Sequence, residues 1–158
     1  MKPTPPLTRS RFLKWASLGP AAAAALALSP SASAADPTPA EKTNLKLVAD
    51  FCAALEARDM ARIATFLSDD CAYRVIETAP PARGKDAIES IRRYVERSTK
   101  IEIKILESWV KGPIVVNERI DTFVPPPANS PYHLTGVFFL RGGKIAEWTD
   151  YLIRTSPA

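Results

Sequence analysis

Three charged residues, Arg119, Asp121 and Asp150, stand out because their neighbours are mostly apolar strand formers. Residues 115–123 read VVNERIDTF, in which strand-forming residues flank a polar middle. Because successive side chains of a strand point to opposite faces, Asn117, Arg119 and Asp121 share one face. Asp150 is the single carboxylate on a strand face that is otherwise apolar. An arginine between two such acids is unusual enough to need a chemical explanation.

An arginine and two aspartates can act as one acid–base group. The planar guanidinium can bridge two carboxylates, and in an apolar pocket this arrangement pushes the two carboxyl pKa values apart. Isolated buried charges are costly, so the three side chains would need to be paired. Two simpler explanations stay open. Arg119 and Asp121 could form a surface ion pair, and Asp150 could lie at a solvated end of a sheet.

The first half of the domain is predicted to be mainly helical. Thr38-Pro39-Ala40-Glu41 is a helix start, after which apolar residues recur at helical spacing up to Leu55. A short second helix follows Asp59 and is expected to include Leu67. Residues 71–77 indicate a strand, residues 79–84 a loop and residues 85–97 a third helix.

The second half has the period of two that is typical of strands. Four strands are expected over residues 100–110, 115–123, 132–140 and 145–153, separated by turns that contain Gly or Pro. Helices first and strands later predict an α+β domain, with an antiparallel sheet and the helices on one side. In the last strand, Ile145 is expected on the face opposite Asp150.

Residues 1–34 have the pattern of a secretory signal peptide. Four basic residues and no acid precede an alanine-rich apolar run, and Ala32-Ser33-Ala34 is a small-residue cleavage site. The stretch TRSRFLKWA is similar to a twin-arginine signal, with Ser10 in place of the second arginine, so both export routes stay open. We expect a periplasmic protein that has no membrane segment after processing, with residues 35–158 forming one domain.

Charge and cysteine content narrow the choice of partners. Four of the 21 basic residues lie in the signal segment, which leaves 17 against 17 acidic residues and gives no surplus for binding nucleic acid. Cys52 is expected in a helix core, with a disulfide to Cys71 as an alternative in an oxidising compartment. The only histidine is His133, and no spacing indicates a metal site.

Several motifs together resemble the limonene-1,2-epoxide hydrolase family of the nuclear transport factor 2-like (SnoaL-like) superfamily. They are ERID at 118–121, GVFFL at 136–140, GKI at 143–145 and WTDY at 148–151. The resemblance covers roughly residues 45–154. It implies a cone: a strongly curved mixed sheet around a deep apolar pocket that N-terminal helices close. It also implies a homodimer, for which a sheet edge could serve as the interface.

The resemblance implies hydrolysis of a small hydrophobic epoxide to a diol in one step, with no metal or cofactor. Asp121 matches the acid, Asp150 the base and Arg119 the bridge. Tyr73 matches a tyrosine that holds the attacking water, but Val75 stands where the family has an asparagine, and Asn117 is the candidate for the missing amide. The expected substrate-binding residues are Phe123, Trp148 and Leu152. An isomerase or cyclase of the same superfamily, and a pocket that only binds an apolar ligand, are the alternatives.

Overall fold

The computed structural model describes residues 36–127 and 131–153. The predicted signal peptide, residues 1–34, lies outside the described residues, so processing and export remain predictions. Within the two described ranges, no helix is long and apolar enough to cross a membrane.

Helix α1 (Pro39–Glu56) begins at the predicted cap. The Thr38 side chain accepts a hydrogen bond from the Glu41 amide, and the Glu41 carboxylate accepts one from the Thr38 amide at 2.8 Å. The same carboxylate accepts a hydrogen bond from the amide of Gly112, also at 2.8 Å. One acidic side chain therefore caps the helix and anchors it to the turn between the two longest strands.

The segment after α1 differs from its prediction. Helix α2 (Met60–Phe66) ends one residue earlier than expected, and strand β1 (Leu67–Arg74) begins at Leu67 instead of Cys71. Leu67 has extended backbone because it pairs with Ile145 of the last strand, a partner far along the chain. The predicted loop contains the two-residue strand β2 (Ala82–Arg83), and helix α3 (Lys85–Arg97) has the predicted bounds.

Six strands form one mixed sheet in the order β2-β1-β6-β5-β4-β3. The long strands are β3 (Lys100–Lys111), β4 (Ile114–Val124), β5 (Tyr132–Arg141) and β6 (Lys144–Leu152). The β1–β6 pair is parallel and the other pairs are antiparallel. The fully antiparallel sheet expected from the strand pattern is therefore wrong at this pair, whereas the mixed sheet implied by the resemblance is confirmed.

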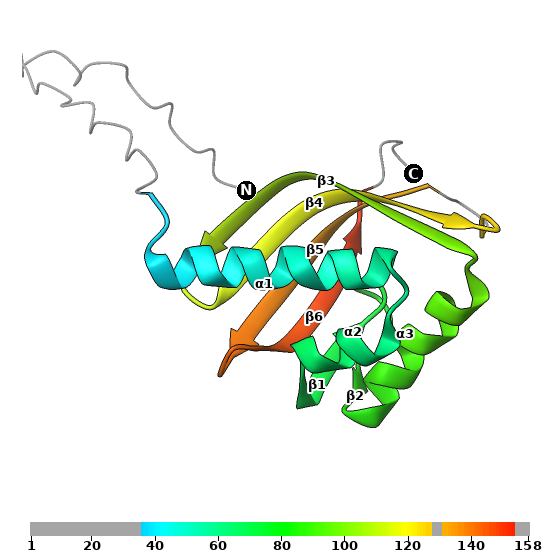
Figure 1. Cartoon of the computed structure of the whole chain (residues 1–158), viewed down its shortest axis with the longest axis horizontal. Helices are drawn as coiled ribbons and strands as arrows, with labels where there is room; N and C mark the ends of the chain where they lie inside the picture. The colour runs from blue at the N-terminus through cyan, green and yellow to red at the C-terminus, as the bar shows by residue number, and fades with distance from the viewer. Residues whose placement is uncertain (1–35, 128–130, 154–158) are drawn as a thin grey trace, which may run out of the picture. The chain divides into compact units, whose positions relative to one another are not determined.

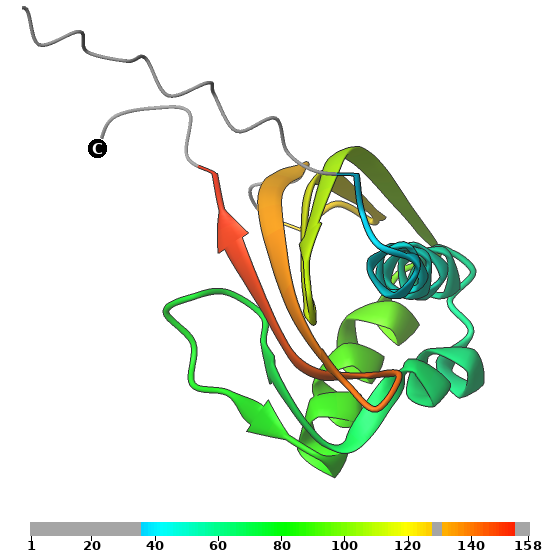
Figure 2. The ribbon, with the colours of Figure 1, turned by 90° about the vertical axis from the view of Figure 1, so that its left-hand side faces the viewer.

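The sheet bends around the helices. Register shifts interrupt the β3–β4 and β5–β6 pairs, next to Leu106 and Ala146, and such bulges bend a strand and increase its twist. Figure 1 shows α1 lying across the sheet, and Figure 2 shows β5 and β6 curving around the helical side. The bulge also buries both Ile145 and Ala146. Ile145 pairs with Leu140, on the same face of β5 as Gly136, the partner of Asp150, so the expected position of Ile145 on the face opposite Asp150 is wrong.

Two further predictions concern packing. Cys52 and Cys71 are both buried and both free, so the alternative of a disulfide is wrong. The convex face of β3, β4 and β5 exposes Trp109, Ile114 and Phe139, whereas Val115 and Phe138 on the other face are buried. The homodimer remains a prediction.

Candidate active site

The Arg119 side chain joins the two aspartates. Its Nε donates to both carboxylate oxygens of Asp121, at 3.1 and 3.2 Å, and its Nη2 donates to Oδ1 of Asp150 at 2.7 Å. Its Nη1 donates to Oδ1 of Asn117 at 2.8 Å. Arg119 is only 1% exposed, and all three partners are buried. Each guanidinium nitrogen therefore has its own acceptor, which is the condition under which a buried arginine is tolerated.

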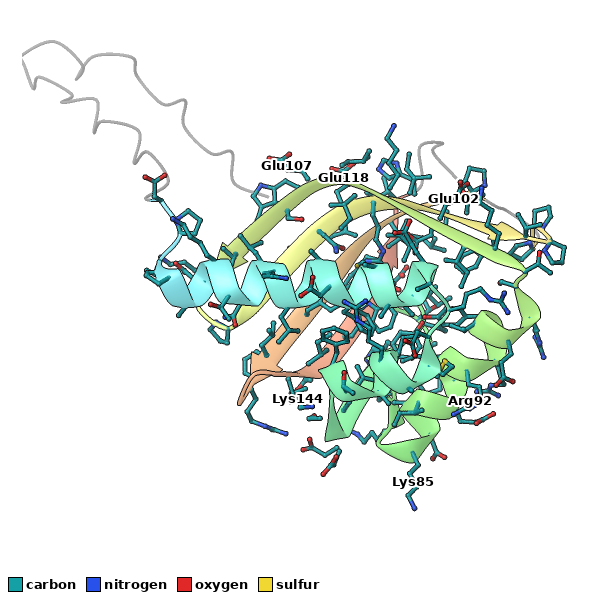
Figure 3. The ribbon with its side chains drawn as sticks, in the orientation of Figure 1. Lys85, Arg92, Glu102, Glu107, Glu118 and Lys144 are labelled. Carbon is teal, nitrogen blue, oxygen red and sulfur yellow. The ribbon has the colours of Figure 1, made fainter. Side chains whose placement is uncertain are left out.

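Strand alternation separates these residues from the other charges of the same strand. Glu118 follows Asn117 in β4 but lies on the opposite face, where it pairs with His133 at 2.7 Å and is opposite Glu107 of β3. Figure 3 shows Glu118 and Glu107 together on the outer side of β3 and β4, away from the helices. Of the ERID motif, only the arginine and the aspartate face the interior.

Gly136 leaves room for the Arg119 side chain to pass over strand β5. In the cross-strand row, Gly136 of β5 lies between Asn117 of β4 and Asp150 of β6. A Cβ atom at position 136 would lie 2.0 Å from Nη1 of Arg119 and 2.8 Å from Oδ1 of Asn117. The absence of a side chain on the central strand is therefore what allows a residue of β4 to reach an acid on β6.

A pocket of about 600 Å³ opens beside this group. Asp121 and Asp150 line it, together with Tyr73 of β1 and Tyr94 of α3. Most of the remaining wall is apolar and comes from α1, β3, β4, β5, β6 and the segment after β4: Leu55, Ile101, Ile103, Phe123, Pro125, Pro126, Pro127, Leu134, Trp148 and Leu152. The volume is in the range of pockets that enclose small organic ligands.

Burial controls the ionisation of the two acids. It raises the pKa of Asp121 to about 6, although the charge of Arg119 acts to lower it. Burial also raises the pKa of Asp150, against the attraction of Arg119 and a hydrogen bond from Trp148. Burial acts to lower the pKa of Arg119, but the charges of Asp150 and Asp121 outweigh it and raise that pKa. The arginine thus stays charged, while the acids share its field and titrate as a pair.

The comparison with protein families decides the assignment. Residues 42–154 match the model of the limonene-1,2-epoxide hydrolase catalytic domain. This span contains the arginine, both aspartates and every strand of the sheet. The chain belongs to the limonene-1,2-epoxide hydrolase family. Membership confirms the predicted enzyme class, an epoxide hydrolase.

Individual relatives agree with the family. Epoxide hydrolase EphG of Mycobacterium tuberculosis (strain ATCC 25618 / H37Rv) is 29% identical over 101 residues, which are 64% of this chain and 67% of the relative. A solved LEH-like epoxide hydrolase of M. tuberculosis superposes with a TM-score of 0.61 at 26% identity, covering 73% of this chain and 86% of the other. An NTF2-like protein from Cytophaga hutchinsonii ATCC 33406 superposes with a TM-score of 0.58 at 13% identity, over 70% and 89% of the two chains. The last similarity concerns the fold alone, which is NTF2-like.

The structure brings together the other residues that the family resemblance pointed to. Tyr73 lines the pocket, and its ring stacks on that of Trp148 at 4.2 Å. Phe123, Trp148 and Leu152 also line the pocket. Trp148 has a polar contact as well, because its Nε1 donates to Oδ1 of Asp150 at 2.8 Å.

Asn117 does not replace the family's amide, so that hypothesis is wrong. Its Oδ1 accepts from Arg119, and its Nδ2 donates to Sγ of Cys52 at 3.8 Å. Asn117 is fully buried and is absent from the pocket wall. Its amide is used inside the sheet to orient the guanidinium. Val75, on the pocket wall, leaves its position without a polar group.

Tyr94 is a polar pocket residue that the sequence analysis missed. Its ring packs edge-on against Phe123 at 5.9 Å, and the residue lies three positions after Ile91 on the inner side of α3. That i, i+3 spacing from a core residue was the available signal.

Within the described ranges, no group of three or more His, Cys, Asp or Glu side chains could hold a metal ion.

We expect Gly136→Ala to damage this family member without removing any catalytic group. The new methyl group would overlap Nη1 of Arg119, so the guanidinium must shift away from Asn117 and Asp150. Overpacking of this kind costs about 1–3 kcal/mol. Chemical denaturation would measure the loss, and epoxide turnover should fall with it. Thr135→Ala, the neighbouring position on the opposite face, is the control. Wild-type stability and turnover in Gly136→Ala would contradict the steric account.

The raised pKa of Asp121 predicts a pH dependence of stability with a definite sign. In the unfolded chain the carboxyl has a pKa of about 3.9, whereas in the folded protein its pKa is about 6. Between these values the folded state binds more protons, so the free energy of unfolding should decrease as the pH rises from about 4 to about 6. Denaturation of wild type and Asp121→Asn across this range should show a smaller decrease in the variant.

Asp70→Asn is the control for this pH dependence. The pKa of Asp70 is lowered, with hydrogen bonds from Ser68 and Arg141 as the main causes. Its contribution to stability is therefore present above the unfolded pKa and lost only at lower pH. The Asp70→Asn variant should therefore show the same change in the free energy of unfolding between about pH 4 and pH 6 as the wild type. If the free energy of unfolding of the wild type instead rose over this pH range relative to that of Asp121→Asn, Asp121 would not be a buried acid with a raised pKa.

Proposed function

We propose that the chain hydrolyses a small hydrophobic epoxide to a vicinal diol in one step. Asp121 protonates the epoxide oxygen, and Asp150 takes a proton from the water that attacks carbon. Arg119 holds the two acids in their places. No other group of the described residues combines two buried acids with a shared cation and a pocket wall.

The unequal hydrogen bonding of the two acids supports this division of roles. Oδ1 of Asp150 accepts two short hydrogen bonds, at 2.7 Å from Arg119 and 2.8 Å from Trp148. Among the described residues, Asp121 receives only the single Nε–H of Arg119, shared between its oxygens at 3.1 and 3.2 Å. Short hydrogen bonds from a charged donor stabilise the ionised carboxylate more strongly. The proton of the pair is therefore retained by Asp121, and Asp150 is the base.

The proposed step is balanced in protons. The water oxygen forms a bond to an epoxide carbon while the carbon–oxygen bond of the ring breaks. Asp121 gives its proton to the released oxygen, and Asp150 receives one from the water. The pair ends with its single proton on the other acid, so the next turnover needs only its return to Asp121. General acid and general base catalysis each contribute about 10²- to 10⁴-fold in rate.

The pocket supports a compact, apolar substrate. A volume of about 600 Å³ accommodates a small molecule with a hydrocarbon frame, and the wall is mostly hydrocarbon except near the acids. A hydrophobic epoxide fits a pocket that is polar only near the acids, because it has one weakly hydrated oxygen and is otherwise apolar.

Incubation of the purified protein with a panel of cyclic and linear epoxides, followed by a chromatographic assay for diols, tests the proposal. We expect diol formation with at least one hydrophobic epoxide, and its loss in Asp121→Asn. Isomerisation of a carbonyl compound without any diol would favour the isomerase alternative. Binding of apolar ligands with no turnover of any panel member would favour the binding module.

A further inference from the structure

The pocket contains a second polar group besides the Asp–Arg–Asp group, made of two tyrosine hydroxyls. Tyr73 comes from β1 and Tyr94 from α3, and both line the pocket with Asp150. Each hydroxyl contributes to the electrostatic environment of the other, and the charge of Asp150 acts on both, so the three groups belong to one part of the pocket. Burial raises the pKa of each hydroxyl well above 10, so both keep their protons at neutral pH.

Neighbouring rings hold both tyrosines in place. The Tyr73 ring stacks on Trp148 at 4.2 Å, and Trp148 in turn donates to Asp150. The Tyr94 ring meets Phe123 edge-on at 5.9 Å. Each hydroxyl is therefore fixed by an aromatic contact from a different side of the pocket, which is the kind of preorganisation that water positioning needs.

One oxygen of Asp150 remains for a water molecule. Oδ1 already accepts from Arg119 and Trp148, whereas among the described residues no donor is assigned to Oδ2. Each neutral tyrosine hydroxyl has one proton that it can donate. A water beside Oδ2 could thus donate to the base and accept from the pair.

We propose that Tyr94, together with Tyr73, positions the attacking water against Oδ2 of Asp150. This inference rests on the proposed epoxide hydrolysis. It assigns to a helix residue the role that an amide at position 75 would have, because Val75 offers no hydrogen bond and Asn117 is occupied by Arg119 and Cys52. Tyr94 is a water-positioning residue, and its substitution should affect kcat more than the binding of the epoxide.

The test is Tyr94→Phe, which removes the hydroxyl and keeps the ring against Phe123. We expect kcat to fall about 10- to 100-fold, as the loss of one hydrogen bond to the reacting water implies, with KM changed by less than about threefold. Adding Val75→Asn to Tyr94→Phe should restore part of kcat, which a purely structural role of Tyr94 would not allow. Tyr151→Phe, an exposed tyrosine of β6, is the matched control and should behave as wild type.

Two outcomes would overturn the role of Tyr94: an unchanged kcat in Tyr94→Phe, or a loss that appears in KM alone. Circular dichroism and thermal unfolding verify that the variant is folded, and if it is not, Tyr94→His provides a ring with a hydrogen-bonding group for the same measurement. If the wild type forms diol while Tyr94→Phe keeps its kcat, only this inference fails. If the wild type forms no diol from any epoxide, the proposed function itself fails.

Discussion

Asp121→Asn and Asp150→Asn should each lower kcat/KM by about 10²- to 10⁴-fold, because each removes one of the two proton transfers. Asparagine has nearly the same size as aspartate and can still accept a hydrogen bond from Arg119, so the fold should persist. Steady-state kinetics on an epoxide that the wild type converts, with circular dichroism on the same samples, would measure both properties.

Glu118→Gln is the matched control for these two substitutions. It removes a carboxylate from the same strand as Asp121, but from the opposite face, where Glu118 pairs with His133. Turnover should stay within about twofold of wild type, because surface pairs contribute little. If Asp121→Asn retained most of the rate, the acid–base assignment would be wrong.

Arg119→Ala should be the most destabilising single substitution at the site. It leaves two buried acids and the Asn117 amide without their shared donor, and breaking a buried ion pair in this way costs about 3–5 kcal/mol. The loss of stability should be larger at pH 8 than at pH 5. Without the arginine, the two buried acids avoid an unpaired charge only when they are protonated, and protonation is favoured at the lower pH. Urea denaturation at the two pH values would measure it.

Arg119→Lys should recover little of the activity or the stability. An ammonium group is a compact point charge, whereas Arg119 reaches three acceptors with three separate nitrogens. Arg141→Ala provides the control, since Arg141 pairs with Asp70 at 2.6 Å but both side chains are more than half exposed. That change should cost less than about 1 kcal/mol. An equally small cost in Arg119→Ala would contradict the buried network.

Local alternation in the sequence was sufficient to predict which polar residues face the interior. Between residues 115 and 121 the strand is regular, so the period of two placed Asn117, Arg119 and Asp121 on one face without any tertiary information. The same rule failed at Ile145, because a bulge at the β5–β6 turn adds a residue and buries two successive side chains. Bulges leave no reliable mark in a single sequence.

Features that depend on distant partners could not be predicted. Leu67 became a strand residue because it pairs with β6, almost eighty positions later. Asn117 lay on the expected face, but its bonds to Arg119 and Cys52 remove it from the pocket. Tyr94 lines the same pocket as the two acids only because α3 packs against the sheet. The family resemblance supplied the acids and Tyr73, but it could not reveal a substitute from another element.

Arg119 is already hydrogen-bonded within the protein, and most of the pocket wall is apolar, which has a consequence for product release. All three nitrogens of Arg119 are engaged within the protein, and the wall away from the acids is made of residues such as Ile103, Phe123 and Leu152. A diol carries two hydroxyls, and each loses its hydration on entering such a wall without gaining an equivalent partner. The pocket should thus retain the starting epoxide better than the product. Diol should escape to water as it forms, and its accumulation should inhibit the enzyme only weakly.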